Sequence, residues 1–123
     1  MQIDCVRASS YGHGTSSSGE VTISGMTSDV SGRSVLLIED IVDTGLTLEK
    51  LRAYMLGLGA TSCEIVTLLD KVERRKNSLV PEYVGFICPD EFVVGFGLDY
   101  GGLVSYSSEQ LDCCLADFPH PVP

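Results

Sequence analysis

The chain has 123 residues, 44% of them hydrophobic, and a formal charge of −9 from 17 acidic and 8 basic side chains. No apolar run approaches the ~20 residues that a membrane-spanning helix needs, so a soluble protein with one small core is expected. The acidic surface disfavours nucleic acid and anionic membranes as partners, because both bind surfaces rich in lysine and arginine.

The first residues predict a strand. They lack the basic-then-apolar layout of a signal peptide, which favours a cytoplasmic protein. The five cysteines show no C-x-x-C spacing, which is typical of free thiols in a reducing compartment. Residues 9–34 are rich in Ser, Gly and Thr, and we expect a mobile loop or linker there. It is interrupted by a short alternating strand at Glu20–Ser24.

The middle of the chain predicts a βαβ unit. Ser34–Ile38 has the continuous apolar character of a buried parallel strand, and Glu64–Leu69 is a second such strand. Between them, Thr47–Leu58 is a predicted helix with Gly59 at its C-terminal cap. The helix has four apolar residues on one face: Leu48, Leu51, Met55 and Leu58. The two strands should therefore pair in parallel.

The pattern weakens toward the C-terminus. Two short strands, Tyr83–Ile87 and Phe92–Phe96, are predicted on either side of a turn at Pro89-Asp90. From Leu103 onward there is no clean period of 2 or 3.6, so little regular structure is expected. We therefore divide the chain into an α/β core with a parallel sheet, residues 1–100, and a divergent, poorly ordered tail, residues 101–123.

The most informative segment is Val35–Thr47, in which an apolar strand ends in acids and a small-residue turn opens a helix. Glu39 and Asp40 end the strand and Asp43 follows in the turn. Ligands of open parallel sheets bind at the carboxyl ends of the strands, and a helix N-terminus attracts anions. The segment predicts a site for a sugar phosphate, helped by a divalent cation. The competing interpretation makes Asp43 a helix N-cap and the other two acids solvated.

This segment resembles the signature of type I phosphoribosyltransferases, specifically their hypoxanthine(-guanine) branch. Three further stretches resemble the same family in the same order. Arg7–Gly12 resembles its flexible catalytic loop, which would span residues 8–19, and Leu68–Lys71 resembles the strand end that reads the purine. Residues 88–100 resemble the purine-stacking segment and the aspartate that follows it. The resemblance implies an α/β parallel-sheet core, here partial, over residues 3–100.

The implied activity is purine salvage. Hypoxanthine or guanine would displace pyrophosphate from phosphoribosyl pyrophosphate in a Mg²⁺-dependent reaction, giving IMP or GMP. Asp43 would be the general base, and Ser10 and Tyr11 would lie in the catalytic loop. Glu39 and Asp40 would hold the ribose hydroxyls and, with Asp99, the metal ion. The 5-phosphate would be cradled by the turn residues Asp43, Thr44, Gly45, Leu46 and Thr47.

The resemblance also implies how the base is held. Lys71 would donate to the six-position oxygen, which disfavours adenine and leaves hypoxanthine, guanine and xanthine open. Phe92 would stack on the ring, and the carbonyl of Val93 would accept from the base edge. Each residue has a structural alternative: Lys71 belongs to a solvated charge run, Phe92 could be core, Asp99 a strand-end acid, and Ser10-Tyr11 linker residues.

Two departures from the family pattern qualify this expectation. The family begins with a core strand and a pyrophosphate-binding loop that the residues before Ile3 do not match. It also carries an arginine after the aspartate, whereas no arginine follows Arg75 here. A fragment or mis-joined product, weakly active or inactive alone, is therefore expected. The alternatives are a non-catalytic remnant that binds phosphoribosyl pyrophosphate, or an inert chain. A homo-oligomer is expected if the family's assembly is retained.

Overall fold

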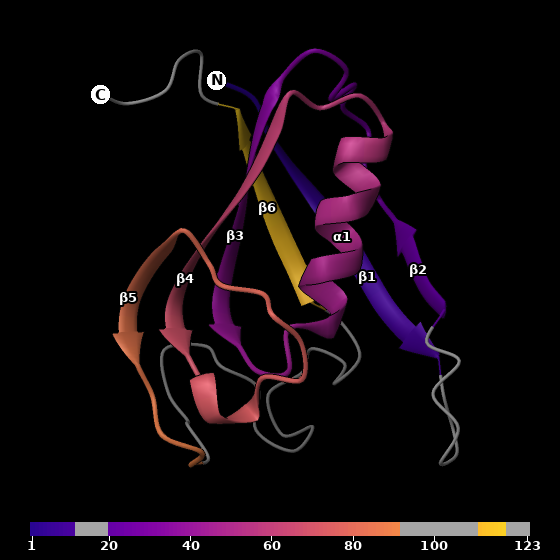
Figure 1. Ribbon diagram of the computed structural model, residues 1–123. Coiled ribbons are helices and arrows are strands. Elements are labelled where there is room, and N and C mark those ends of the chain that lie inside the picture. Colours follow the sequence, from indigo (N-terminus) through magenta and orange to yellow (C-terminus); the bar gives the residue numbers. More distant parts are fainter. Residues whose placement is uncertain (12–19, 92–110, 118–123) are drawn as a thin grey trace.

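The structure is a computed structural model that describes residues 1–11, 20–91 and 111–117 (Figure 1). These residues form a six-stranded mixed sheet with the order β2-β1-β6-β3-β4-β5. Helix α1 lies across one face of that sheet (Figure 1). In the part of the chain that the structure describes, no helix has both the length and the apolar character needed to cross a membrane.

The predicted βαβ unit is present. Strand β3 is Ser34–Val42, helix α1 is Leu46–Gly57 and strand β4 is Ser62–Asp70. β3 and β4 pair in parallel, with Leu37 opposite Ile65, and β5, Tyr83–Ile87, adds to β4 in parallel. A single turn of 3-10 helix, η1, at Val72–Arg74 connects β4 toward β5. The expected strand at Phe92–Phe96 lies outside the described residues.

Helix α1 ends as its sequence predicts. The Ala60 N–H donates to the Met55 carbonyl at 3.2 Å, and the Gly59 N–H donates to the Leu56 carbonyl at 3.1 Å. This pair of bonds is the Schellman motif, which needs a left-handed residue after the helix. Gly59 supplies it with φ +94°. The role assigned to Gly59 from the sequence is confirmed.

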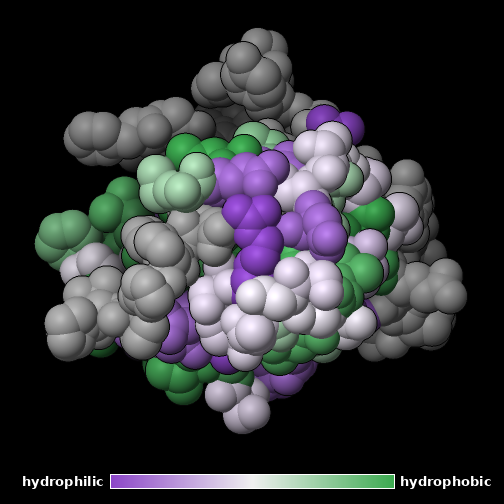
Figure 2. Space-filling view, turned by 90° about the horizontal axis from the view of Figure 1, so that it is seen from above, coloured by the Kyte–Doolittle hydropathy of each residue, from purple (hydrophilic) through white to green (hydrophobic). Residues whose placement is uncertain are grey.

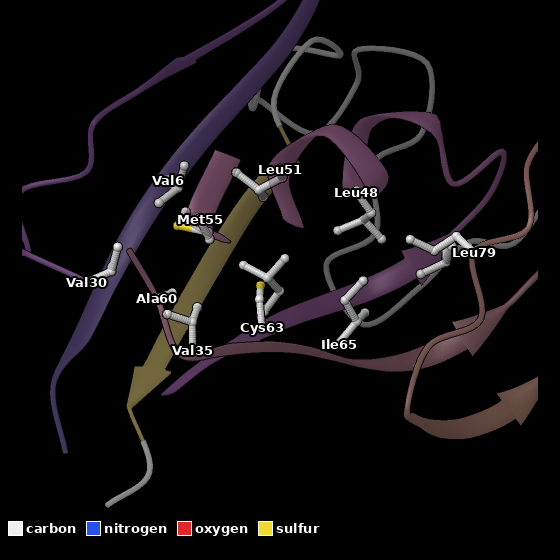
Figure 3. Close-up of a cluster of buried hydrophobic side chains, with 12 residues drawn as sticks. Val6, Val30, Val35, Leu48, Leu51, Met55, Ala60, Cys63, Ile65 and Leu79 are labelled. Carbon is white, nitrogen blue, oxygen red and sulfur yellow. The ribbon is translucent and has the colours of Figure 1, made fainter. Parts of the chain in front are cut away.

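The core lies between α1 and the sheet (Figure 3). Leu51 and Met55 from the helix are fully buried, as are Leu37 of β3 and Ile65 of β4. Successive strand residues face opposite sides of a sheet, so the buried positions of β3 and β4 alternate with more exposed ones. Burial of four large apolar side chains contributes about 1.5–3 kcal/mol each, and it fixes α1, and with it the turn that precedes α1, against the sheet.

The N-terminal region differs from the expected loop. Strand β1 is Ile3–Tyr11, so residues 9–11 continue a strand where we predicted a mobile segment from residue 8 or 9 onward. That prediction was wrong because the composition of a serine-rich stretch does not reveal a backbone partner. The partner is β2, Glu20–Ser24, which pairs antiparallel with β1 and was predicted correctly. Residues 12–19 of the expected catalytic loop lie outside the described residues.

A carboxylate fixes the start of β1 to the loop that follows β2. The side chain of Asp4 accepts hydrogen bonds from the backbone N–H groups of Thr27 at 2.8 Å and Ser28 at 2.7 Å. It also accepts one from the Thr27 hydroxyl at 3.1 Å. These donors stabilise the ionised form and so hold the pKa of Asp4 well below its usual range, and the Thr27 N–H has the largest effect.

The C-terminal region also departs from the sequence prediction. Residues 103–123 were expected to have little regular structure, yet Leu111–Asp117 forms strand β6. β6 lies between β1 and β3 and pairs antiparallel with both, with Cys114 opposite Cys5 on one side and Ile38 on the other. A strand paired on both edges is stabilised by hydrogen bonds to its neighbours' backbones, so its sequence need not show the alternating pattern of a strand.

Candidate functional site

The carboxyl ends of four strands meet at one edge of the sheet. β3, β4 and β5 are parallel, and β1 runs in the same direction because both β1 and β3 are antiparallel to β6 (Figure 1). Backbone hydrogen bonds join the ends of β3, β4 and β5: the Lys71 N–H donates to the Val42 carbonyl at 2.9 Å, and the Cys88 N–H donates to the Asp70 carbonyl at 2.9 Å. Ser10 and Tyr11, at the end of β1, therefore lie along the same edge as the acidic turn and Lys71.

The opposite edge of the sheet has a different character. Figure 2 looks onto that end, where a hydrophilic area lies at the centre of the described surface. Arg33 donates to the Gln2 side chain there at 2.7 Å, and Gln2 donates to the Ser28 hydroxyl at 2.8 Å. These bonds link the chain start to the loop before β3, whereas the acidic turn and Lys71 lie at the other end.

The turn between β3 and α1 leaves the start of the helix open. Gly45 is the N-cap residue, with φ +80°, and no side chain caps the helix through a hydrogen bond. The Leu46 N–H reaches only the Thr44 hydroxyl, at 3.5 Å, while the Glu49 N–H bonds the Gly45 carbonyl at 3.0 Å. Uncapped N–H groups and the helix dipole together favour a bound anion. The interpretation of Asp43 as the N-cap is wrong, because Gly45 holds that position.

The three acids of the segment do not share one environment. Glu39 is buried, with 5% of its surface exposed, whereas Asp40 and Asp43 are exposed. Glu39 and Asp40 are adjacent in β3, so their side chains face opposite sides of the sheet. One oxygen of Asp40 accepts the neighbouring Ile41 N–H at 2.7 Å. Within the residues described, no three His, Cys, Asp or Glu side chains are grouped as a metal cluster.

Two polar residues after β4, Arg75 and Asn77, pack against the turn between β3 and α1, and we call them the polar brace. Arg75 forms a buried ion pair with Asp70 and donates to the Leu79 carbonyl. The Asn77 side chain donates to the Gly45 carbonyl at 3.0 Å and to Glu49 at 3.0 Å. The packing is close: a Cβ added at Gly45 would lie 2.7 Å from Arg75 Cδ and 2.8 Å from Asn77 Oδ1. Gly45 is thus required by its backbone angle and by this contact.

Sequence reasoning missed the brace. It treated the polar run after β4 as solvated apart from Lys71, and neither hydrophobic period nor turn chemistry marks a buried arginine in such a run. The one available signal was Asp70 at the end of an apolar strand, since a carboxylate there needs a partner if it is buried.

Arg74 contacts the turn from the solvent side. Its Nε donates to Asp43 Oδ1 at 2.9 Å and lies 3.7 Å from Asp90 Oδ1. All three side chains are about half exposed. The hydrogen bond to Asp43 is the main cause of a raised pKa of Arg74, and the negative charges of Asp43 and Asp90 add to it. The remaining predicted site residues, Phe92, Val93 and Asp99, lie outside the described residues.

The chain resembles known proteins along most of its length. The sequence profile of the phosphoribosyl transferase domain matches residues 1–101. The hypoxanthine-guanine phosphoribosyltransferase of Bacillus subtilis is 50% identical over 101 residues, which are 81% of this chain and 56% of that protein. The Lactococcus lactis enzyme of the same name is also 50% identical over 101 residues, 81% of this chain and 55% of that protein. This chain thus spans about half the length of these relatives.

Solved structures agree with the sequence comparison. A crystal structure of a hypoxanthine phosphoribosyltransferase from Staphylococcus aureus superimposes with a TM-score of 0.72 and 49% identity, covering 79% of this chain and 53% of that one. A hypoxanthine-guanine phosphoribosyltransferase structure from Bacillus anthracis gives a TM-score of 0.71 with 38% identity, over 89% of this chain and 62% of that one. Profile, identity and fold lead to one assignment: the chain belongs to the phosphoribosyl transferase family.

Proposed function

We propose that this chain performs, or supplies the core for, phosphoribosyl transfer from phosphoribosyl pyrophosphate to hypoxanthine or guanine. The observation that carries the proposal is the uncapped N-terminus of α1 at Gly45. It lies at the carboxyl ends of the parallel strands, next to Asp43 and to the polar residues Arg75 and Asn77. The 50% identity to hypoxanthine-guanine phosphoribosyltransferases supports the choice of substrates. The products would be the nucleoside monophosphate and pyrophosphate, as in purine salvage.

The turn would bind the 5-phosphate of the sugar. Its N–H groups and the hydroxyls of Thr44 and Thr47 are the donors available at the start of α1, and Gly45 lets the backbone approach the anion closely. Helix and turn are held rigidly from behind by Arg75 and Asn77. A fixed phosphate would place the anomeric carbon at a fixed distance from Asp43, which is the benefit of a rigid anchor in a transfer reaction.

Asp43 would act as the general base. In the transfer, the bond from the anomeric carbon to the pyrophosphate oxygen breaks and a bond to the purine imidazole nitrogen forms. The purine loses a proton from its imidazole ring, and the exposed Asp43 carboxylate would accept it. Lys71, directly after β4, would donate to the six-position oxygen. The roles proposed for Ser10, Tyr11, Phe92, Val93 and Asp99 follow from the family resemblance.

Mg²⁺ would be held by few protein oxygens. The exposed Asp40 carboxylate suits a hard cation, whereas the buried Glu39 faces the other side of the sheet. Magnesium usually keeps several waters and binds one or two carboxylates together with substrate phosphates, so Asp40 with Asp99, whose role follows from the family resemblance, fits that mode. When bound, the ion would neutralise charge on the leaving pyrophosphate, which matters in a chain with a formal charge of −9. A cytoplasmic location and a homo-oligomer complete the proposal.

The test is nucleotide formation by the purified chain with Mg²⁺, phosphoribosyl pyrophosphate and hypoxanthine or guanine. Asp43→Asn should lower kcat by roughly 10²–10⁴-fold, the usual contribution of a general base. Asp29→Asn is the matched control, because it makes the same chemical change at the far edge of the sheet and should leave turnover unchanged. Folding of each variant is verified by circular dichroism.

A second measurement separates catalysis from binding. Calorimetric titration with phosphoribosyl pyrophosphate and Mg²⁺ should give saturable binding that Gly45→Ala weakens. Binding without any nucleotide product, from a chain that melts cooperatively, would overturn the proposed transfer and identify a binding remnant. Neither product nor binding would overturn both parts of the proposal.

A further inference from the structure

We propose that Arg74 is a positioning residue, which holds one oxygen of Asp43 and couples that carboxylate to the turn after β5. The proposal rests on the proposed function, because it concerns the orientation of the general base during phosphoribosyl transfer. It goes beyond that function by assigning a role to a side chain that the sequence pattern left among solvated charges.

The geometry places Arg74 between two strand ends. It ends η1, the 3-10 turn after β4, and its Nε donates to Asp43 Oδ1 at 2.9 Å in the turn after β3. The same nitrogen lies 3.7 Å from Asp90 Oδ1 in the turn after β5. Asp90 stands two positions before Phe92, which is the residue expected to stack on the purine. One guanidinium thus lies close to carboxylates in two turns, those after β3 and β5.

This contact settles which oxygen of Asp43 is available. A charge-assisted bond fixes Oδ1, while no described residue forms a hydrogen bond with Oδ2. A carboxylate held by one oxygen has its other oxygen aimed in a defined direction, as an orienting group does for a catalytic base. Oδ2 is therefore the atom that would receive the purine proton.

Exposure decides what kind of effect Arg74 has. Its side chain is 47% exposed and that of Asp43 is 48% exposed, so water and salt screen the pair and its contribution to folding stability is small. Orientation is a separate matter, because a reacting group displaced by about 1 Å can lose 10²-fold in rate. Arg74 should therefore change turnover much more than it changes the melting temperature.

The experiment compares Arg74→Ala, Arg74→Lys and Lys76→Ala in the full chain. Lys76→Ala is the matched control, because it removes the same charge from the same segment. The backbone N–H of Lys76 donates to the turn, and no described residue forms a hydrogen bond with its side chain. Arg74→Ala should lower kcat/KM for hypoxanthine on the order of tenfold, leaving KM for phosphoribosyl pyrophosphate unchanged. Lys76→Ala should stay within about twofold of the parent on the same scale.

Two further readouts exclude a purely structural role. Added guanidinium should restore part of the activity of Arg74→Ala, and Arg74→Lys should recover only part because an ammonium is a point charge without the planar fork. In side-chain ¹⁵N NMR of the ligand-free protein, the Arg74 Nε–H signal should shift when Asp43 is changed to Asn. Equal kinetics for Arg74→Ala and Lys76→Ala would overturn the positioning role while leaving the proposed function intact.

The failures are distinguishable. A parent chain that neither forms nucleotide nor binds hypoxanthine with phosphoribosyl pyrophosphate would overturn the proposed function, and the positioning role would fall with it. An active parent with an Arg74 Nε–H signal that is insensitive to Asp43→Asn would overturn the inference alone.

Discussion

Breaking the buried pair between Asp70 and Arg75 should be the most destabilising single polar change in the described part of the chain. The two side chains are 7% and 10% exposed, so neither charge can recover its hydration when the other is removed. Asp70→Asn leaves the Arg75 guanidinium buried without a counter-charge. Arg75→Met likewise leaves the Asp70 carboxylate buried without a counter-charge. Removing one partner of such a pair costs about 3–5 kcal/mol. That is a large share of a typical folding free energy of about 5–15 kcal/mol.

The pair is also a test of how the turn is held, because Arg75 packs against Gly45. Urea unfolding at constant m-value measures each single variant and the double variant Asp70→Asn with Arg75→Met. The double variant should lose less than the sum of the singles by more than about 1 kcal/mol, since it leaves no buried charge unpaired. Single variants that lose under about 1 kcal/mol, or losses that simply add, would refute the assignment of a coupled buried pair.

Three further predictions concern separate features. Gly45→Ala should cost about 1–3 kcal/mol, because alanine is strained at φ +80° and meets the brace, whereas Gly57→Ala, with open space around it, should be neutral or slightly stabilising in thermal melts. The depressed pKa of Asp4 gives stability that is full above pH ~4 and is lost as the pH falls further. Asp4→Asn should therefore weaken the fall of melting temperature with decreasing pH below pH ~4, and an unchanged fall would contradict this. Burial raises the pKa of Cys63 to about 11, so mass spectrometry after iodoacetamide treatment at pH 8 should find Cys5 modified and Cys63 unmodified until urea unfolds the chain.

The sequence predicted those elements whose signals are local. The apolar runs that became β3 and β4 carry their own period, as do the buried helix residues Leu48, Leu51 and Met55, so these elements could be recognised without distant partners. The fourth residue predicted on that helix face, Leu58, instead follows the last helical residue and is 40% exposed. Gly59 was recognisable because few residues other than glycine end a helix in the left-handed conformation. The acid-rich turn was located for the same reason, since its spacing is contained within thirteen consecutive residues.

What the sequence did not predict depends on partners far along the chain. The continuation of β1 through residue 11 needs β2 beside it, and β6 needs β1 on one edge and β3 on the other. Arg75 looks like any exposed arginine until the fold brings Asp70 and the Leu79 carbonyl around it. Within the site, the same limit applied to Arg74, whose two carboxylate partners come from turns after different strands.

The place of β6 in the sheet has a consequence for how the protein folds. Ile3 pairs with Ala116, so the hydrogen bonds that join the N-terminal hairpin to the central sheet connect residues near the two ends of the described chain. Contacts of such high contact order form late, because a long loop must close before they form. During synthesis, the unit β3-α1-β4 can pack while β6 is still in the ribosome. The edges of β1 and β3 that β6 later pairs with stay open until then, and open strand edges are prone to pair with other chains.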